Sequence, residues 1–205
     1  MLFRKILGEK EFLQAKGFYK PIVTFMISKS QVILKDQQMK RIVEKLANDI
    51  YESHKKTKKL VLIGILSKGE VLANRIKVLL NQKSDLVVDV YQLDITIFRD
   101  DLDIKGPSLE FTQCKPLPNI NGCHVILIDD VLFEGRTMRG ALSSLLDVGR
   151  AKKIQTAVLV DRGHRAMPIV ANYLGIYLET RIQDFVRVRF LEIDGEDKIV
   201  LESLD

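Results

Sequence analysis

Three segments that are typical of buried strands constrain the fold of this chain more than any other feature. They are LVLIGI (60–65), HVILI (124–128) and IQTAVLVD (154–161). Continuous apolar strands are typical of a parallel sheet that is covered by helices on both faces. The segments between these runs follow helical spacing, so strands and helices alternate along the chain. This alternation predicts an α/β fold with right-handed crossovers.

The clearest helical pattern runs from Asp36, the expected N-cap, to Ser53. A second helix is expected over 71–80. A third is expected after Gly135, with these apolar side chains facing inward: Met138, Ala141, Leu142, Leu145 and Leu146. The segment 86–98 and the short stretches after Tyr173 are rich in strand-forming residues. The polar stretch 99–122 is too long for an ordinary connection and is expected to be functional or disordered.

Size and composition limit the class of protein. A chain of 205 residues holds one well-buried core. No apolar window is long enough to span a bilayer, and charges recur too early for a signal peptide, so we expect a cytoplasmic protein with reduced cysteines. The net charge of +5 suits a phosphate-bearing ligand or a nucleic acid. Met26 would be a natural start, so residues 1–25 are interpreted as a poorly packed N-terminal extension and 26–205 as the single domain.

The stretch VILIDDVLFEGRTMRGAL (125–142) places two adjacent carboxylates, Asp129 and Asp130, at the end of a buried strand. In an open parallel sheet, ligands bind beyond the carboxyl ends of the strands. Vicinal carboxylates can each accept a hydrogen bond from one of the paired hydroxyls of a ribose. The alternative is that the two aspartates only cap the loop and the helix, without a ligand.

The loop after the aspartates has the features of an anion site. Gly135 can adopt a positive φ, which lets the backbone N–H groups of residues 134–138 converge at the start of a helix. These N–H groups and the Thr137 hydroxyl suit a phosphate monoester. The whole stretch therefore fits a ribose 5-phosphate.

This stretch resembles a known signature. IDDVLFEGRTMRGAL is similar to the phosphoribosyl pyrophosphate (PRPP) motif of type I phosphoribosyltransferases. Three further segments resemble the bifunctional pyrimidine operon regulator/uracil phosphoribosyltransferase family: VILKDQ (32–37), LDITIFRDDL (93–102) and DVGRAKKIQTAVLVDRGHRAMPIVANYLG (147–175). The resemblance covers about 32–200, and VDRGHR with its following proline is its most specific part. It implies the type I phosphoribosyltransferase fold, a mainly parallel central sheet flanked by helices, with a small hood and a flexible loop.

The resemblance also implies the reaction and the residues that bind PRPP. Ribose 5-phosphate would pass from PRPP to a nucleobase while pyrophosphate leaves, with Mg²⁺ as cofactor. Asp129 and Asp130 would bind the ribose hydroxyls and orient Mg²⁺-bound water, and Arg99 would close over the diphosphate. The remaining PRPP-binding residues implied are Glu134, Gly135, Arg136, Thr137 and Met138 at the 5-phosphate, and Ser67, Lys68 and Gly69 at the pyrophosphate.

The base site would include Phe133, Asp161, Arg162 and Gly163. Purine-type relatives generally carry an aspartate at the position of Phe133. Phenylalanine cannot exchange a proton, so uracil is the expected base. For Arg162 and Arg165, a solvated surface charge is the alternative.

Glu134 departs from the family pattern, which has threonine there. A carboxylate about 5 Å from a bound phosphate is repelled by roughly 3 kcal/mol at an effective dielectric of 20. That corresponds to about two decades of affinity. The side chain can avoid this by rotating to solvent, or it can occupy the anion site when no ligand is bound. We therefore expect PRPP binding, with activity weakened by Glu134.

Regulators of this family bind messenger RNA through a basic face of a dimer. The basic candidates here are Arg139, Arg150, Lys152, Lys153, His164 and Arg165. Glu44, Asn48 and Ser53 stand where relatives tend to show hydroxyl, histidine and arginine, which weakens the case for RNA. Three hypotheses stay open: an enzyme that makes uridine monophosphate, an RNA-binding attenuator that senses nucleotides, and a catalytically weak nucleotide-binding relative. The resemblance also suggests a homodimer or higher homo-oligomer.

Overall fold

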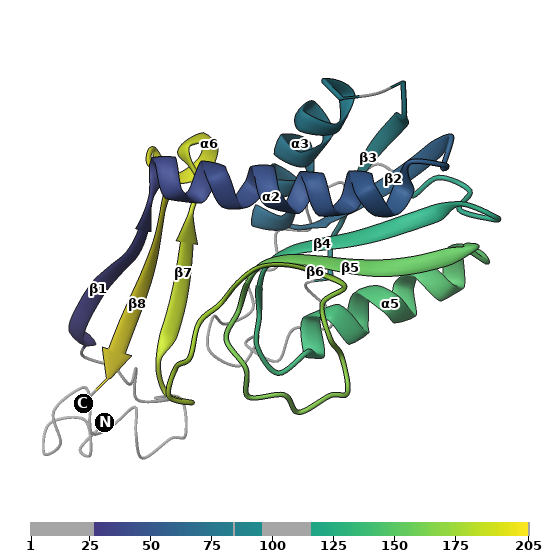
Figure 1. Cartoon of the computed structure of the whole chain (residues 1–205). Helices are drawn as coiled ribbons and strands as arrows, with labels where there is room; N and C mark the ends of the chain where they lie inside the picture. Colours follow the sequence, from purple (N-terminus) through teal and green to yellow (C-terminus); the bar gives the residue numbers. More distant parts are fainter. Residues whose placement is uncertain (1–26, 84, 96–115, 205) are drawn as a thin grey trace, which may run out of the picture.

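A five-stranded parallel sheet forms the centre of the molecule (Figure 1). The computed structural model describes residues 27–83, 85–95 and 116–204. The strand order is β3-β2-β4-β5-β6, and every neighbouring pair is parallel. The strands are β2 (Lys59–Ile65), β3 (Val87–Leu93), β4 (His124–Leu132), β5 (Lys153–Asp161) and β6 (Tyr173–Tyr177). The predicted α/β fold with a parallel sheet is confirmed.

Helices cover both faces of this sheet (Figure 1). Helices α2 (Asp36–His54) and α3 (Lys68–Asn81) pack on one face, and α5 (Arg136–Val148) packs on the other. The side chains of β4 alternate between the two sides: Ile126 and Ile128 join the core under α2 and α3, whereas Val125 and Leu127 join the core under α5. Because both faces are buried, apolar residues fill consecutive positions in the middle of the central strands, as in Leu60–Ile63 and Val125–Ile128.

A second, three-stranded antiparallel sheet forms a hood beside the main sheet. It consists of β1 (Ile27–Lys35), β8 (Lys198–Leu204) and β7 (Phe185–Arg189), in the order β1-β8-β7, with the short helix α6 (Leu191–Asp194). Arg75 of α3 joins the hood to the main domain. Its guanidinium donates to the carboxylates of Glu192, at 2.6 and 2.9 Å, and Asp197, at 2.7 and 2.8 Å. This double ion pair fixes the hood next to the carboxyl ends of the main strands.

Several boundaries differ from the sequence predictions. Lys35, not Asp36, is the N-cap of α2, and α3 begins at Lys68. Strand β4 does not end before Asp129 but continues to Leu132, because β5 offers it pairing partners that far: Asp129 pairs with Val158 and Leu132 pairs with Asp161. The two aspartates therefore lie inside the last part of the strand.

Two side-chain and segment predictions are also corrected. Leu146 was expected to face inward but is 68% exposed, because it falls on the solvent side of α5. One of the strand-forming stretches expected after Tyr173 is FVRVRFLEI (185–193), but its strand β7 ends at Arg189 and α6 begins at Leu191. The extension 1–25, Arg99 and most of the polar stretch 99–122 lie outside the described residues. In the described part of the chain, no helix is long and apolar enough to cross a membrane.

Candidate active site

A cleft of about 430 Å³ opens at the carboxyl ends of β2 and β4, and β7 of the hood forms one of its walls. It is lined by Leu66, Ser67, Lys68, Asp129, Asp130, Val131, Phe133, Thr137, Arg162, Phe185, Val186, Arg187 and Val188. Residues from three distant parts of the sequence meet here because parallel strands bring their carboxyl ends to one edge of the sheet, and β7 of the hood adds a fourth part. The cleft is the place where the sequence analysis expects a sugar phosphate.

Asp129 and Asp130 form the acidic floor of the cleft. Asp129 is only 8% exposed, and its Oδ1 accepts a hydrogen bond of 2.9 Å from the backbone N–H of Asp130. Burial raises the pKa of Asp130, although a hydrogen bond with Asp129 and the charge of Lys68 oppose this shift. A carboxylate whose charge is poorly compensated in this way is stabilised by any cation that enters the cleft.

Residues 133–137, called the phosphate loop below, join β4 to α5. Gly135 has φ +92° and is the N-cap of α5, so the first N–H groups of the helix have no intrahelical partner and remain available to an anion. Thr137 lines the cleft, whereas the side chain of Met138 is buried in the core under α5. Only the backbone of Met138 is therefore placed to contact a ligand.

Glu134 is paired with a neighbour in the phosphate loop. Its carboxylate Oε2 lies 2.5 Å from Nε of Arg136. Both side chains are partly exposed, at 32% and 46%, and Glu134 does not line the cleft. The pair partly neutralises the carboxylate that the sequence analysis identified as a repulsive group.

Ser67, Lys68 and Gly69 lie where β2 leads into α3. A Cβ on Gly69 would come closer than 3.0 Å to the carbonyl oxygen of Ile128 in β4. Glycine therefore lets the start of α3 lie directly against the strand that carries the aspartates. The ammonium group of Lys68 donates to the carbonyl oxygen of Val188 in the hood and lies 3.8 Å from the carboxylate of Asp194.

Phe133 and Arg162 form the opposite side of the cleft. The guanidinium carbon of Arg162 lies 4.0 Å from the centroid of the Phe133 ring, a cation–π contact. Arg162 is 5% exposed and donates to the carbonyl oxygens of Arg181, at 2.8 Å, and Ile182, at 3.2 Å. Burial lowers the pKa of Arg162, and the nearby carboxylate of Asp184 opposes this shift.

The other two predicted base-site residues lie behind this wall. Neither Asp161 nor Gly163 lines the cleft. The Asp161 carboxylate instead accepts hydrogen bonds from the backbone N–H of Gly163, at 2.9 Å, and from the guanidinium of Arg165. Asp161 and Gly163 are therefore bonded to other protein groups behind the cleft wall and do not face the cleft.

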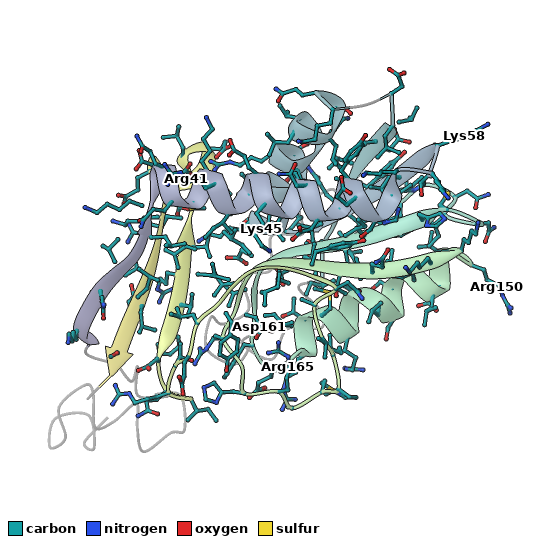
Figure 2. The ribbon with its side chains drawn as sticks, viewed as in Figure 1. Arg41, Lys45, Lys58, Arg150, Asp161 and Arg165 are labelled. Atoms are coloured by element: carbon teal, nitrogen blue, oxygen red, sulfur yellow. The ribbon has the colours of Figure 1, made fainter. Side chains whose placement is uncertain are left out.

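The six basic residues considered for RNA fall into three places. Arg150, Lys152 and Lys153 lie at the amino end of the main sheet, and Figure 2 shows Arg150 at the same end of the molecule as Lys58. His164 and Arg165 follow β5 at the carboxyl end, and Arg139 is exposed on α5. The structure therefore does not gather them on one surface of a single chain.

The hood contributes residues that the sequence analysis missed. Phe185, Val186, Arg187 and Val188 of β7 line the cleft. The pattern FVRVR signals a strand but carries no motif for a binding site. Its position depends on pairing with β8 and on the Arg75 ion pairs, which a local pattern does not reveal.

A divalent cation would depend on few protein ligands in this cleft. Among the residues described, no group of three His, Cys, Asp or Glu side chains is close enough to hold a metal. Mg²⁺ often keeps several waters and binds through one or two carboxylates together with substrate phosphates. The adjacent carboxylates of Asp129 and Asp130, with the raised pKa of Asp130, fit such a cation.

The fold and the cleft define a phosphoribosyltransferase. A family model described as the phosphoribosyl transferase domain matches residues 30–188. Among curated relatives, the Bifunctional protein PyrR of Clostridioides difficile (strain 630) is 40% identical over 185 residues, which cover 87% of this chain and 100% of the relative. The Bifunctional protein PyrR of Alkaliphilus metalliredigens (strain QYMF) is 42% identical over 179 residues, covering 86% and 97%. The chain belongs to the phosphoribosyltransferase family and, within it, to the PyrR group.

Solved structures support the fold independently. The hypoxanthine phosphoribosyltransferase of Trypanosoma cruzi matches with a TM-score of 0.65 at 17% identity, covering 85% of this chain and 97% of that one. The Leishmania tarentolae enzyme in complex with GMP matches with a TM-score of 0.64 at 16% identity, covering 85% and 96%. The type I phosphoribosyltransferase fold expected from the sequence is confirmed, and the protein is a PRPP-dependent pentosyltransferase.

Proposed function

We propose that this phosphoribosyltransferase converts uracil and PRPP to uridine monophosphate and pyrophosphate. The observation that carries the proposal is the meeting of an acidic pair, an open helix start and an aromatic wall in one cleft of about 430 Å³. These three parts match the sugar, the 5-phosphate and the base of a single nucleotide.

In this proposal, Asp129 and Asp130 accept hydrogen bonds from the two ribose hydroxyls. The backbone N–H groups of the phosphate loop and the Thr137 hydroxyl hold the 5-phosphate. Mg²⁺, when bound with PRPP, would neutralise the leaving pyrophosphate next to the aspartates. Fixing the sugar at both ends restrains its anomeric carbon in the orientation that the displacement requires.

The pyrophosphate would lie near residues 67–69 and the hood. Lys68 now donates to the carbonyl oxygen of Val188, so its ammonium group is already held at the cleft wall. An arriving diphosphate offers this cation a stronger, charged acceptor than a carbonyl group. We therefore expect Lys68 to turn from the hood to the ligand when PRPP binds.

Uracil is the proposed base because Phe133 and Arg162, the described residues of the wall opposite the sugar site, include no general base. Phe133 offers a flat apolar face, and Arg162 supplies guanidinium N–H donors beside it. The carbonyl oxygens of uracil can accept such donors, whereas a purine route would use a proton acceptor that phenylalanine cannot provide.

We further propose that Glu134 lowers the affinity for PRPP, but by less than its unpaired charge would. Its pairing with Arg136 at 2.5 Å offsets part of the repulsion from a bound phosphate. Glu134→Thr is expected to tighten PRPP binding by up to about two decades, the value for a carboxylate that is not paired with Arg136. An unchanged affinity would mean that the carboxylate does not face the phosphate.

The assay of the proposed function uses isotope-labelled uracil with PRPP and Mg²⁺, with hypoxanthine and guanine run in parallel. Labelled uridine monophosphate is the expected product. No product at high enzyme concentration would reject uracil phosphoribosyl transfer. A faster reaction with a purine base would keep the transferase class and overturn the assignment of the base.

RNA binding is the second candidate function, and the amino end of the main sheet favours it. Leu60 of β2 pairs with His124 of β4, which pairs with Lys153 of β5, so the loops before β2 and β5 lie about two strand spacings, or roughly 10 Å, apart. Together these loops carry cations whose side chains make no ion pair with described residues: Lys56, Lys58, Arg150, Lys152 and Lys153. Such a cluster suits a phosphate backbone.

The test is a gel shift with a pyrimidine-operon leader RNA, with and without uridine monophosphate. Replacing Lys58, Lys152 and Lys153 by glutamine should reduce the slope of log K against log salt by about 0.7 for each lost single-strand phosphate contact. The control variant carries the same change of charge at Lys29, Lys40 and Lys77. No shift of the wild type at low salt would eliminate RNA binding, and equal losses in both variants would remove the amino end as its site.

A further inference from the structure

The guanidinium of Arg165 donates several hydrogen bonds to groups at the carboxyl end of the sheet. Its position in the sequence had suggested an exposed cation. Its Nη1 donates to the carbonyl oxygens of Phe133, at 2.5 Å, and Gly163, at 2.9 Å. Its Nε donates to the carbonyl oxygen of Ile169, at 2.9 Å, and its Nη2 to the Asp161 carboxylate. The side chain is 23% exposed. Nearly all of its donors therefore point into the protein.

These bonds connect the phosphate loop to residues 163–169, called the backing loop below. One partner of Arg165, Phe133, begins the phosphate loop, and two others, Gly163 and Ile169, are the first and last residues of the backing loop. Figure 2 shows Asp161 and Arg165 near each other, on the side of the sheet where α5 begins. A planar guanidinium can hold several acceptors in fixed directions, which lysine cannot do.

The backing loop also touches the phosphate loop directly. The backbone N–H groups of Ala166 and Met167 donate to the carbonyl oxygen of Glu134, at 3.1 and 3.0 Å. A Cβ on Gly135 would lie 3.2 Å from Cβ of Met167 and 3.4 Å from Cβ of Ile169. The backing loop thus closes the space behind the left-handed turn at Gly135. The direction of the N–H groups at the start of α5 depends on this support.

We propose that Arg165 is a positioning residue for phosphoribosyl transfer: it clamps the backing loop against the phosphate loop and so aims the N–H groups that bind the 5-phosphate. The inference rests on the proposed assignment of residues 133–137 to the 5-phosphate. Arg165 itself contacts no ligand in this account. Its loss would loosen one end of the cleft and leave the pyrophosphate side, at residues 67–69, intact.

The test compares two ligands that occupy opposite ends of the cleft. Ribose 5-phosphate and inorganic pyrophosphate are titrated, by calorimetry with Mg²⁺, into the wild type, Arg165→Gln and Arg165→Lys. We expect Arg165→Gln to lower the affinity for ribose 5-phosphate by about tenfold or more, because several hydrogen bonds from a charged donor are lost. The affinity for pyrophosphate should change by less than about twofold. Arg165→Lys keeps the ion pair with Asp161, so its affinity for ribose 5-phosphate should lie between those of the wild type and Arg165→Gln.

The control is Arg41→Gln, because Arg41 is an exposed arginine on α2 at the hood end of the helix (Figure 2). It should leave both affinities unchanged. Amide hydrogen exchange gives a second readout: in the Arg165 variants, exchange should accelerate at residues 134–138 but not in α2. If Arg165→Gln does not fold, Arg165→Lys carries both measurements.

Two results would overturn the proposal. In one, the affinities for both ligands fall equally in the Arg165 variants, which indicates general loss of structure. In the other, ribose 5-phosphate binding is unchanged. If the wild type binds pyrophosphate but not ribose 5-phosphate, while exchange at residues 134–138 still accelerates in the variants, the clamp stands and the assignment of the phosphate loop fails instead.

Discussion

The two ends of the five-stranded sheet differ in how many of their cations are bonded to the protein, although Lys55 and Lys59 at the amino end do form ion pairs. At the carboxyl end, Lys68, Arg162 and Arg165 all donate to backbone carbonyl groups or carboxylates of the protein. At the amino end, Lys58, Lys152 and Lys153 make no such bond to described residues and point toward solvent. Inward bonds hold the residues that line or support the cleft in one geometry. Unpaired lysines stay mobile, which suits a polyanion that can be bound in many geometries.

One glycine from each end of the sheet shows a similar contrast in packing. Gly69, at the carboxyl end, has no room for a Cβ because the carbonyl group of Ile128 lies against it. Gly122, at the amino end, has φ +69° but no atom within 4 Å of its would-be Cβ. Gly69 is therefore required by close packing of backbone on backbone, whereas Gly122 is required only by the conformation of its turn.

The largest predicted effect tests this comparison between Gly69 and Gly122 directly. Gly69→Ala should destabilise the fold by about 3 kcal/mol, because the new methyl group must push α3 away from β4. It should also lower kcat/KM by more than about a hundredfold, since a misplacement of 1 Å can cost that much. Gly122→Ala should cost only about 1–2 kcal/mol, from its left-handed backbone, and leave kcat/KM unchanged. Urea unfolding and steady-state turnover measure both; equal effects of the two substitutions would contradict the account.

The next effect concerns the pH dependence of the cleft. Burial raises the pKa of Asp130 above its ordinary value of about 3.9, so this carboxylate takes up a proton at a higher pH than an exposed aspartate does. PRPP and Mg²⁺ require the ionised form. Their affinity should therefore fall as the pH drops through the raised pKa, by up to about tenfold per pH unit.

Asp130→Asn is the matched variant for this measurement. It should bind PRPP more weakly at neutral pH and should lose the part of the pH dependence that comes from Asp130. The protonation of the 5-phosphate itself contributes equally to both proteins and cancels in the comparison. Identical pH profiles for the two proteins in calorimetric titrations would show that Asp130 does not titrate with binding.

The smallest effect lies at the amino end and concerns stability. His54 is 3% exposed, and its ring nitrogens contact Thr57, at 3.2 Å, and Gln155, at 3.1 Å. Burial lowers the pKa of His54 below 6.5, although the hydrogen bond that its Nε2 donates to Oε1 of Gln155 opposes this shift. As the pH falls through about 6.5, the unfolded chain binds a proton that the folded chain does not bind.

The free energy of unfolding should therefore fall with decreasing pH below about 6.5, by at most about 1.4 kcal/mol per pH unit from His54, and stay level above about pH 7.5. His54→Gln should reduce this slope while binding of PRPP at neutral pH stays unchanged. Urea unfolding at a series of pH values provides the measurement. A slope that is the same in both proteins would assign the effect to other groups, such as His124, whose pKa burial also lowers.

The main sheet could be predicted from the sequence because burial on both faces leaves a local signature. The runs 60–65, 124–128 and 154–161 all became central strands. The hood could not be predicted in the same way. Strand β1 pairs with β8 from the other end of the chain, so Val32 meets Val200, and no local pattern encodes such a pairing.

The same reasoning explains what could be predicted of the cleft. Spacing alone indicates which residues are close together when they share one short stretch of sequence, as do Asp129, Asp130, Gly135 and Thr137. Arg165 shows the limit of such reading. A basic residue in a polar loop suggests a surface charge, but the carbonyl groups that bind its guanidinium are placed by tertiary structure. RNA binding by Arg165 stays a prediction, and the structure shows in addition that its guanidinium bonds to groups of the protein itself.

The most direct test of the account is a crystal structure of the protein with PRPP and Mg²⁺. We predict density for the ribose hydroxyls against Asp129 and Asp130, with the 5-phosphate at the N–H groups of residues 134–138. Density for the ligand elsewhere, with this cleft empty or collapsed, would contradict the central claim.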